Sequence, residues 1–291
     1  MLSILIPVYN YPIAALLKSL HEQCVAGGIA FEILVQDDAS TLFYIDNTEA
    51  ATALPHCKFE ANKANLGRTH TRKILAEKAA FETLLFLDAD VMPASSQFIK
   101  NYVEFIGTKN VVLGGYAYTN NNDPDKSLRY TYGKSREEKP ASERNKNTYA
   151  SVFSGNILID KQVFIDNNYA DNLNFYGLDI YFSYKLYYNA VPVIHIDNTI
   201  YHLGLESNKV YFDKQLQSVK VRKELLADEP GIENVNSLLK HYKKLKKLHL
   251  TGIVSIMFLL SRGILKKMIL RKNPSLFCLD IYRLGYICQL K

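Results

Sequence analysis

The first half of the chain alternates short apolar runs with segments whose apolar residues recur at helical spacing. Four apolar runs predict strands, at 3–7, 31–35, 58–61 and 83–87. Two segments between them, 13–24 and 69–80, predict helices; in the first, Leu16 and Leu20 share one face. Apolar strands that alternate with amphipathic helices are typical of a parallel sheet covered on both faces.

The pattern changes after the first 120 residues. The stretch 120–148 is polar, charged and poor in aliphatic residues, and it predicts a mobile loop. Regular structure returns with an apolar run at 152–159, a helix near 179–189 and a strand near 191–196. The chain contains no internal repeat and no low-complexity tract.

Polar residues gather where the predicted strands end. Tyr9 and Asn10 follow the first strand, Asp37 and Asp38 follow the second, and an Asp88-Ala89-Asp90 triplet follows the fourth. The carboxyl ends of parallel strands meet at one edge of a sheet, and ligands bind in the crevice beyond that edge. These clusters are therefore predicted to form one site.

Asp88 and Asp90 are the first candidates for a cation site. They are two residues apart, directly after a buried strand, so both carboxylates can face one point. Carboxylate oxygens suit Mg²⁺ or Mn²⁺, which usually keep waters and bind substrate phosphates. The alternative is a turn residue followed by a helix cap, since Asp serves both roles.

Five motifs occur together in order along the first 210 residues. They are V/I-P-V-Y-N at 6–10, D-D-A-S at 37–40, N-x-G-x-x-x-x-R at 65–72, F-L-D-A-D at 86–90 and S-G-N-x-L-I at 154–159. In this set the chain resembles family 2 glycosyltransferases, which have the GT-A fold. The resemblance implies an inverting nucleotide-sugar transferase, with a mixed, mostly parallel central sheet flanked by helices.

The resemblance also implies a nucleotide-sugar pocket. Its residues would come from the five motifs: Pro7, Tyr9, Asn10, Asp37, Asp38, Asn65, Gly67, Arg72, Asp88, Ala89, Asp90, Ser154, Gly155 and Asn156. Asp37 and Asp38 would hold the base and ribose, and Asp88 would contact the sugar-nucleotide. Arg72 matches the family's helix arginine, which supports the nucleotide pocket; the alternative is an ion pair with a surface carboxylate.

The family places its catalytic base in a G-x-E-D segment, which reads Gly177-Leu178-Asp179 here. Asp179 is retained and can remove the acceptor proton alone, whereas the Glu is replaced by Leu178. That replacement bears on acceptor positioning more than on the chemistry. The alternative is that Asp179 caps a helix beginning near Ile180.

Metal ligation is the third implied role. Asp90 would chiefly bind Mn²⁺ or Mg²⁺ on the diphosphate, and a metal there offsets charge on the departing nucleotide. Asp88 and His202 are the further candidate ligands, because some relatives use a histidine at the position of His202. His195 lies on an alternating strand and is assigned a structural role.

Charge divides the chain unevenly. The 291 residues carry a net charge of +6, yet residues 207–291 hold 17 Lys and Arg against 6 Asp and Glu. Between 234 and 279 there are ten basic residues and no acidic one. Four widely spaced cysteines exclude a disulfide scaffold and a thiolate zinc site.

The basic region predicts helices with apolar faces edged by Lys and Arg, notably over 237–247 and 264–272. Such helices lie in a membrane interface, so an anionic membrane surface is the expected partner. The alternatives are packing on the body, a homodimer interface, and nucleic acid; the last lacks the interleaved aromatics and known modules of nucleic-acid readers.

The sequence therefore predicts a catalytic GT-A domain at 1–210 and a basic amphipathic helical region at 211–291. Within the domain, residues 1–115 bind the nucleotide-sugar and residues 150–210 form the acceptor side. The expected activity is transfer of a sugar from UDP to the hydroxyl of a glycan or lipid-linked acceptor in surface polysaccharide assembly. Transfer to polyprenyl phosphate and non-catalytic nucleotide-sugar binding are the alternatives.

No leader and no spanning helix are expected from the sequence, which begins directly with an apolar strand-like run. The expected location is cytoplasmic, peripheral on the inner face of the membrane.

Overall fold

The computed structural model describes residues 1–169 and 176–290. Over these residues the centre of the molecule is a seven-stranded sheet with strand order β3-β2-β1-β4-β8-β6-β9. Its strands are β1 (Leu2–Val8), β2 (Phe31–Asp37), β3 (Cys57–Ala61), β4 (Thr83–Leu87), β6 (Val111–Leu113), β8 (Asn156–Asp160) and β9 (Val193–His195). Strands β1 to β4 are parallel to one another. The expected mixed α/β architecture with a mostly parallel central sheet is confirmed.

Strand β8 runs antiparallel between β4 and β6, so the sheet is mixed. Its register pairs Leu87, the last residue of β4, with Asn156, the first residue of β8. It brings the residues before β8, Ser154 and Gly155, alongside Asp88, which follows β4.

A smaller sheet forms a second layer at the same edge. It consists of β5 (Val91–Pro93), β10 (Ile200–His202) and β7 (Tyr116–Ala117), in the order β5-β10-β7. Because β10 pairs antiparallel with β5, His202 lies opposite Val91 and next to Asp90. The register of these short strands thus joins two residues that are far apart in sequence.

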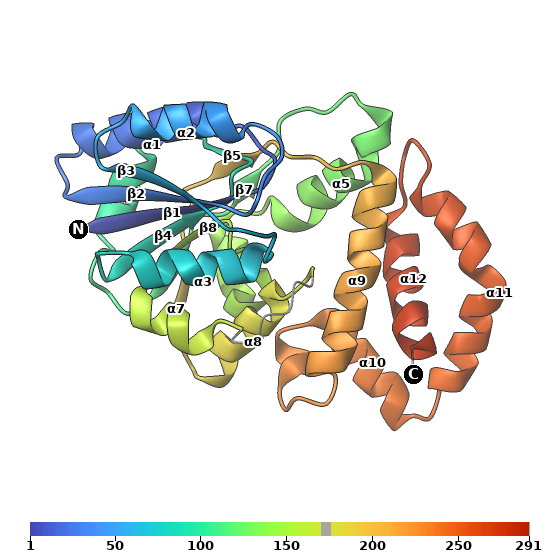
Figure 1. Cartoon of the computed structure of the whole chain (residues 1–291). Coiled ribbons are helices and arrows are strands. Elements are labelled where there is room, and N and C mark those ends of the chain that lie inside the picture. The colour runs from blue at the N-terminus through green and yellow to red at the C-terminus, as the bar shows by residue number, and fades with distance from the viewer. Residues whose placement is uncertain (170–175, 291) are drawn as a thin grey trace.

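Helices cover both faces of the central sheet (Figure 1). One face carries α1 (Ala14–Ala26), α2 (Tyr44–Thr52) and α4 (Phe98–Val103); the other carries α3 (Arg68–Lys78), α7 (Lys161–Asn167) and α8 (Asp179–Tyr188). Leu17 and Phe98 pack with Ile4 and Ile6 on the first face. A separate cluster on the second face packs Leu75 and other helical side chains against Leu5 and Phe86.

The stretch 120–148 is not the mobile loop that its composition predicts. It folds into short helices: η1 (Pro124–Lys126), α5 (Ser127–Tyr132), η2 (Gly133–Glu137), α6 (Ala141–Arg144) and η3 (Asn145–Ser151). Leu128 is fully buried, and Arg129 is buried in an ion pair with Glu137. Arg144 is also buried and donates hydrogen bonds to backbone carbonyls of Leu113 and Ile196. Internal partners therefore order this polar segment.

The C-terminal region is helical and lies at one side of the sheet (Figure 1). It comprises α9 (Asn208–Leu226), η4 (Ile232–Asn234), α10 (Ser237–Lys247), α11 (Thr251–Ile269) and α12 (Leu276–Gln289). Phe212 of α9 packs with Phe258 of α11, with Leu279 of α12 and with Leu128 of α5. The boundary at residue 210 stays a prediction.

One detail of the predicted membrane surface is wrong. The apolar face of α10, formed by Leu238, Leu239 and Tyr242, is buried in the protein core, so the packing alternative holds for this helix. Helix α11 instead exposes apolar side chains, with Leu260 at 82% exposure. Within the described residues no single helix has the length and apolar character to cross a bilayer; α10 and α11 pass that test only together, and they are bent by 119°.

Candidate active site

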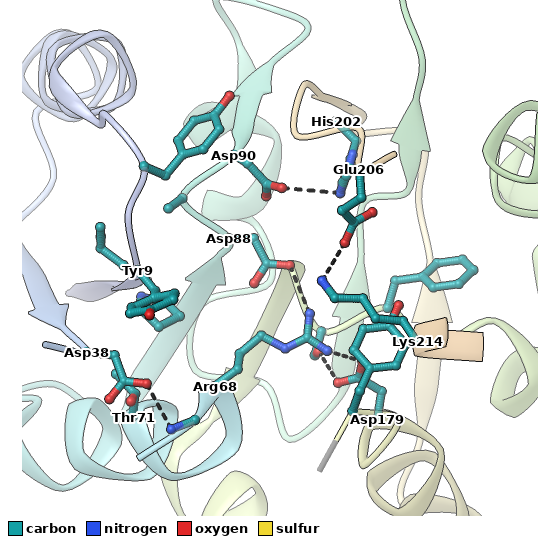
Figure 2. Close-up of a pocket in the computed structure, with 18 of the residues that line it drawn as sticks. Tyr9, Asp38, Arg68, Thr71, Asp88, Asp90, Asp179, His202, Glu206 and Lys214 are labelled. Atoms are coloured by element: carbon teal, nitrogen blue, oxygen red, sulfur yellow. Dashed lines mark hydrogen bonds and ion pairs between the residues drawn. The ribbon is translucent and has the colours of Figure 1, made fainter. Parts of the chain in front are cut away.

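A cavity of 490 Å³ opens at the carboxyl ends of β1, β2 and β4. It holds most of the residues that the motifs predict: Pro7, Tyr9, Asp38, Asn65, Gly67, Asp88, Ala89, Asp90, Ser154, Asp179 and His202. Figure 2 shows Tyr9 and Asp38 toward one end and Asp179 at the other. The fold therefore gathers residues from all five sequence motifs around one space.

Asp38 fixes the loop that leads into α3. Its carboxylate accepts hydrogen bonds from the backbone N–H groups of Leu66 and Gly67, both at 2.8 Å, and from the Asn62 side chain. These bonds hold the Asn65-Leu66-Gly67 turn against the end of β2. Asp38 thus shapes the predicted nucleotide end of the cavity as well as lining it.

Two arginines one helical turn apart on α3 organise the other end. Arg68 lies between two carboxylates, 2.5 Å from Asp179 and 3.6 Å from Asp88 (Figure 2). Arg72 is buried behind it, donates to Asp88 at 2.5 Å and to Ser154, and lies 3.6 Å from Asp179. The alternative of an ion pair with a surface carboxylate therefore does not describe Arg72, whose ion pair with Asp88 is buried behind the cavity.

Asp179 is ionised by this arrangement. Burial alone would raise the pKa of Asp179, but Arg68 and Arg72, with the hydrogen bond from Ser154, lower it below its usual range. Asp179 is the first residue of α8, and its carboxylate binds these side chains rather than capping the helix. The capping alternative therefore does not describe its contacts.

Asp90 and His202 form a second polar pair in the cavity. Asp90 Oδ2 lies 3.5 Å from His202 Nε2, and His202 Nδ1 is buried without a hydrogen-bond partner among the described residues. Burial is the main cause that raises the pKa of Asp90; His202 opposes the rise, and Asp88 and Glu206 add to it. A carboxylate and an imidazole facing one space are donors that suit a divalent cation.

The predicted set of three metal ligands is not assembled. In the part of the chain that the structure describes, no three His, Cys, Asp or Glu side chains come together as a metal site. Asp88 is engaged by Arg68 and Arg72 instead of facing Asp90 and His202. The donor set therefore supplies at most two protein ligands, Asp90 and His202. Mg²⁺-type ions are often bound in this way, with phosphates and waters completing the coordination.

Two glycines allow the backbone to approach these carboxylates. A Cβ atom at Gly155 would lie 2.2 Å from Asp88 Oδ2, and one at Gly204 would lie 2.0 Å from Asp90 Oδ2. Any side chain at either position would displace the neighbouring carboxylate. Gly155 therefore has a steric role beside the cavity without lining it.

Five predicted residues lie outside the cavity wall: Asn10, Asp37, Arg72, Gly155 and Asn156. Asn10 and Asp37 bind backbone N–H groups of the 40–42 turn. Asn156 is buried, accepts from the Tyr102 hydroxyl and donates to the carbonyls of Gly115 and Asn198. These residues support the site from behind, and their contact with nucleotide stays a prediction.

Several lining residues were not expected from sequence. They are Val8, Tyr11, Arg68, Thr71, Tyr116, Arg129, Glu137, Phe153, Tyr176, Glu206 and Lys214. Arg68 could have been found, because it precedes Arg72 by four residues and so shares its helix face. Lys214, which pairs with Glu206 at 2.5 Å, comes from α9 and depends on tertiary packing alone.

Comparison with known proteins agrees with this geometry. Residues 3–166 match the model of glycosyl transferase family 2. Among solved structures, a mannosyltransferase from Pyrobaculum calidifontis in complex with GDP-Man and Mn²⁺ superposes with a TM-score of 0.59 at 13% identity, over 98% of this chain and 85% of that one. S. aureus TarS 1-349 in complex with UDP gives 0.53 at 21% identity, over 80% and 68%.

The complex of TarS 1-349 with UDP-GlcNAc gives a TM-score of 0.53 at 16% identity, over 98% of this chain and 90% of that one. At these identities the likeness concerns the fold. No curated protein matches the chain. Because the family model covers more than half of the residues, in the region that holds the cavity, the chain belongs to glycosyl transferase family 2.

Proposed function

We propose that this glycosyltransferase moves a sugar from UDP to an acceptor hydroxyl with inversion, and that Asp179 is the general base. The observation that carries the proposal is the position of Asp179. Its ionised carboxylate lies at the end of the cavity opposite Tyr9 and Asp38 (Figure 2). A nucleotide at the Asp38 end would direct its sugar toward Asp179.

The proposed step forms one bond and breaks one. The acceptor oxygen bonds to the anomeric carbon while the bond from that carbon to the diphosphate breaks. The electron pair leaves with the nucleoside diphosphate, and the acceptor proton goes to Asp179. Arg68 lies between Asp179 and Asp88, where its charge offsets the negative charge that develops on the leaving group.

UDP is the proposed nucleotide because two of the compared structures, both of TarS, hold UDP or UDP-GlcNAc. The compared mannosyltransferase holds GDP-Man, so GDP is the other nucleotide to test. A divalent cation, Mn²⁺ or Mg²⁺, is proposed at Asp90 and His202. It would supply positive charge to the diphosphate, and the protein donors would be the Asp90 carboxylate and the His202 imidazole.

The proposed acceptor is a glycan or lipid-linked sugar at an anionic membrane surface, on the cytoplasmic side. Support comes from α11, which exposes Ile253, Ile256, Met257, Leu260 and Ile264. The surrounding segment 234–279 has ten basic residues and no acid. Exposed apolar side chains flanked by Lys and Arg bind membrane interfaces through both burial and charge.

The test is UDP-sugar turnover by wild type and by Asp179→Asn, with Asp213→Asn on the exposed side of α9 as control. We expect Asp179→Asn to keep its affinity for UDP and to lose about 100-fold or more in kcat, the usual scale for a general base. The control should match wild type.

Two outcomes contradict the proposal in different ways. Near-normal turnover by Asp179→Asn would indicate an acceptor that is already ionised, as in transfer to polyprenyl phosphate. Binding of UDP-sugars by wild type with no release of UDP, under hydrolysis or transfer conditions, would indicate a binding protein.

A further inference from the structure

A second cavity lies on the other side of Asp179. It measures 420 Å³, and its walls come from α8, α9, α10, α12 and the segment 132–153. Four residues line both this cavity and the first: Glu137, Phe153, Tyr176 and Asp179. Asp179 therefore faces two connected spaces, and the second is the one that an acceptor would occupy if the first holds the donor.

Arginines with unused donors line this second cavity. Arg222 projects from α9 and Arg283 from α12. Three of their nitrogen atoms, Arg222 Nε and Nη1 and Arg283 Nε, are buried with no hydrogen-bond partner within residues 1–169 and 176–290. Unpaired buried donors on charged groups are costly, so their presence at a cavity wall indicates a missing acceptor.

The carboxylates of this cavity do not supply that acceptor. Glu137 pairs with Arg129 at 3.0 Å, Glu233 with Lys243 at 2.9 Å and Asp280 with Arg136 at 2.7 Å. Asp179 is held by Arg68 and Arg72. Each lining acid is thus engaged by a cation other than Arg222.

Within the described residues, Arg283 has only one ion pair with these acids, and it is a long one. Its Nη1 lies 3.7 Å from Asp280, which is closer to Arg136. In the ion pairs of the described residues neither Arg222 nor Lys240, also in the wall, has an acid partner. Burial and the nearby Arg283 lower the pKa of Arg222, as expected for two like charges without an anion between them.

We propose that this cavity binds a phosphate group of the acceptor, with Arg222 and Arg283 as its ligands. The inference rests on the proposed function, because it names the class of acceptor that reaches Asp179. Guanidinium groups present paired N–H donors that match phosphate oxygens. Two neighbouring cations favour a phosphate or diphosphate over a neutral sugar.

The remaining space suits the sugar that carries the phosphate. The volume of 420 Å³ far exceeds the needs of a free ion. Gln215 Oε1, also in the wall, is buried without a hydrogen-bond donor among the described residues and is available to an acceptor hydroxyl. A phosphorylated sugar would thus place its charge at Arg222 and Arg283 and a hydroxyl toward Asp179.

The experiment has a binding part and a turnover part. In the first, wild type saturated with UDP and Mg²⁺ is titrated with inorganic phosphate and with octyl phosphate, followed by calorimetry. Saturation with UDP keeps these probes out of the nucleotide end. We expect Arg222→Gln and Arg283→Gln to weaken phosphate binding between about 10- and 100-fold, the range for charge-assisted hydrogen bonds.

The matched control is Lys220→Gln, which removes a cation from the exposed face of the same helix as Arg222. It should bind phosphate as wild type does. Arg283 is largely buried, and its substitution can prevent folding. In that case the result for Arg222→Gln alone decides the test. UDP affinity, measured on every variant, should be unchanged.

In the turnover part, a panel of sugars is offered as octyl glycosides, as octyl diphosphates and as methyl phosphodiesters. We expect phosphate-bearing forms to exceed the neutral forms by about 10-fold or more in kcat/KM. Arg222→Gln should remove that preference. Preference for the octyl diphosphate would identify a carrier lipid as the source of the phosphate, and preference for the phosphodiester would identify a phosphate-containing glycan.

Failure of this inference differs from failure of the proposed function. If wild type binds UDP and releases it from a UDP-sugar, yet phosphate does not bind and neutral acceptors are used equally well, the phosphate site is wrong and the activity stands. If wild type neither binds nor turns over UDP-sugars, while phosphate titrated in the absence of UDP still binds and Arg222→Gln weakens that binding, the proposed donor and reaction are wrong instead.

Discussion

Arg68 contacts two carboxylates, Asp179 and Asp88, that have different roles in the proposed reaction. It binds Asp179, the proposed base, more closely than Asp88, which lies near the predicted diphosphate position. The charge of Arg68 is the first of the influences that lower the pKa of Asp179 against its burial. The ionisation of the base is therefore set by a residue on α3, more than 100 positions away in the chain.

Removing Arg68 should change the pH dependence of turnover. In Arg68→Gln the pKa of Asp179 rises, so the base becomes protonated at a higher pH than in wild type. The acid limb of the kcat profile should therefore move to higher pH, while Arg68→Lys should keep most of the wild-type profile. Profiles from pH 3 upward include the wild-type limb, because the pKa of Asp179 lies below the usual aspartate range; an unmoved limb in Arg68→Gln would contradict this account of Asp179.

Asp90 should control metal dependence. Asp90→Asn removes the negative charge and leaves a similar shape, so UDP affinity should lose its dependence on Mn²⁺ while the free energy of unfolding changes little. Calorimetry with Mn²⁺ and with EDTA measures the effect, and Asp46→Asn on the exposed face of α2 is the control. Equal stimulation of wild type and Asp90→Asn by Mn²⁺ would place the cation elsewhere.

His195 should make stability depend on pH outside the site. Burial lowers the pKa of His195 to about 4, the hydrogen bond to the Thr148 carbonyl opposes this, and the imidazole remains neutral beside Arg144. Between pH 6.5 and 4 the unfolded state takes up a proton that the folded state does not. Stability should therefore fall as the pH falls through this window, by about 3 kcal/mol at most.

His195→Gln should remove much of this acid dependence, whereas His241→Gln, on an exposed position of α10, should leave it unchanged. Urea unfolding at several pH values between 4 and 7 measures both variants against wild type. A wild-type slope that persists in His195→Gln would assign the acid sensitivity to other groups.

At the scale of elements, sequence periodicity predicted the first half of the fold well. The expected strand at 83–87 coincides with β4, and the helix at 69–80 corresponds to α3. Each of these elements is either a continuous apolar strand or a helix with a regular apolar face. Its own residues are therefore enough to predict its secondary structure. The site motifs were predictable for the same reason, because each directly follows or precedes such an element.

The segment 120–148 could not be predicted in this way. Its order depends on Arg129 and Arg144, buried charged side chains whose partners include groups far away in sequence: Glu206 for Arg129, and backbone carbonyls at the ends of two strands for Arg144. A pattern of apolar residues carries no information about such pairs. Lys214 was missed for a similar reason, since only the packing of α9 against the body brings it to the cavity, where it lies over the ring of Tyr176.

The two surfaces of the C-terminal helices should respond differently to substitution. Leu239→Ala, in the buried face of α10, should lower the free energy of unfolding by about 2 to 5 kcal/mol. Leu260→Ser, on the exposed face of α11, should change it by less than about 0.5 kcal/mol. Combined with Ile256→Ser and Ile264→Ser, it should instead reduce sedimentation with anionic liposomes.

Urea unfolding and liposome sedimentation, measured on the same preparations, separate these two effects. If the triple serine variant of α11 sediments as wild type does, the exposed apolar face is not a membrane-binding surface. If it unfolds more readily than Leu239→Ala, that face is covered by protein in solution.

At the scale of the whole molecule, the C-terminal helices complete the core. Tyr211 and Phe212 of α9 are buried by Phe258, Leu279 and Tyr282 from α11 and α12. Ile287 of α12 is buried in the cluster that also holds Tyr184 of α8. The charge asymmetry of the sequence suggested an appendage, yet the packing joins both parts.

A chain ending at Glu233 should therefore expose apolar core and aggregate or lose its cooperative unfolding transition. Circular dichroism during heating and size-exclusion chromatography measure this, and a chain ending at Leu290, which removes the terminal Lys291, is the control. A truncated protein that stays monomeric and releases UDP from a UDP-sugar as wild type does would show that residues 1–233 function without α10, α11 and α12.

Helix α9 extends over 19 residues and carries Lys214 at the first cavity and Arg222 at the second. A helix of this length spans about 28 Å and moves nearly as a rigid rod. Since α11 and α12 pack on the same helix, a change in how they pack would shift Lys214 and Arg222 together. The two cavities would then change shape in concert, so that the polar lining of one depends on the position of the other.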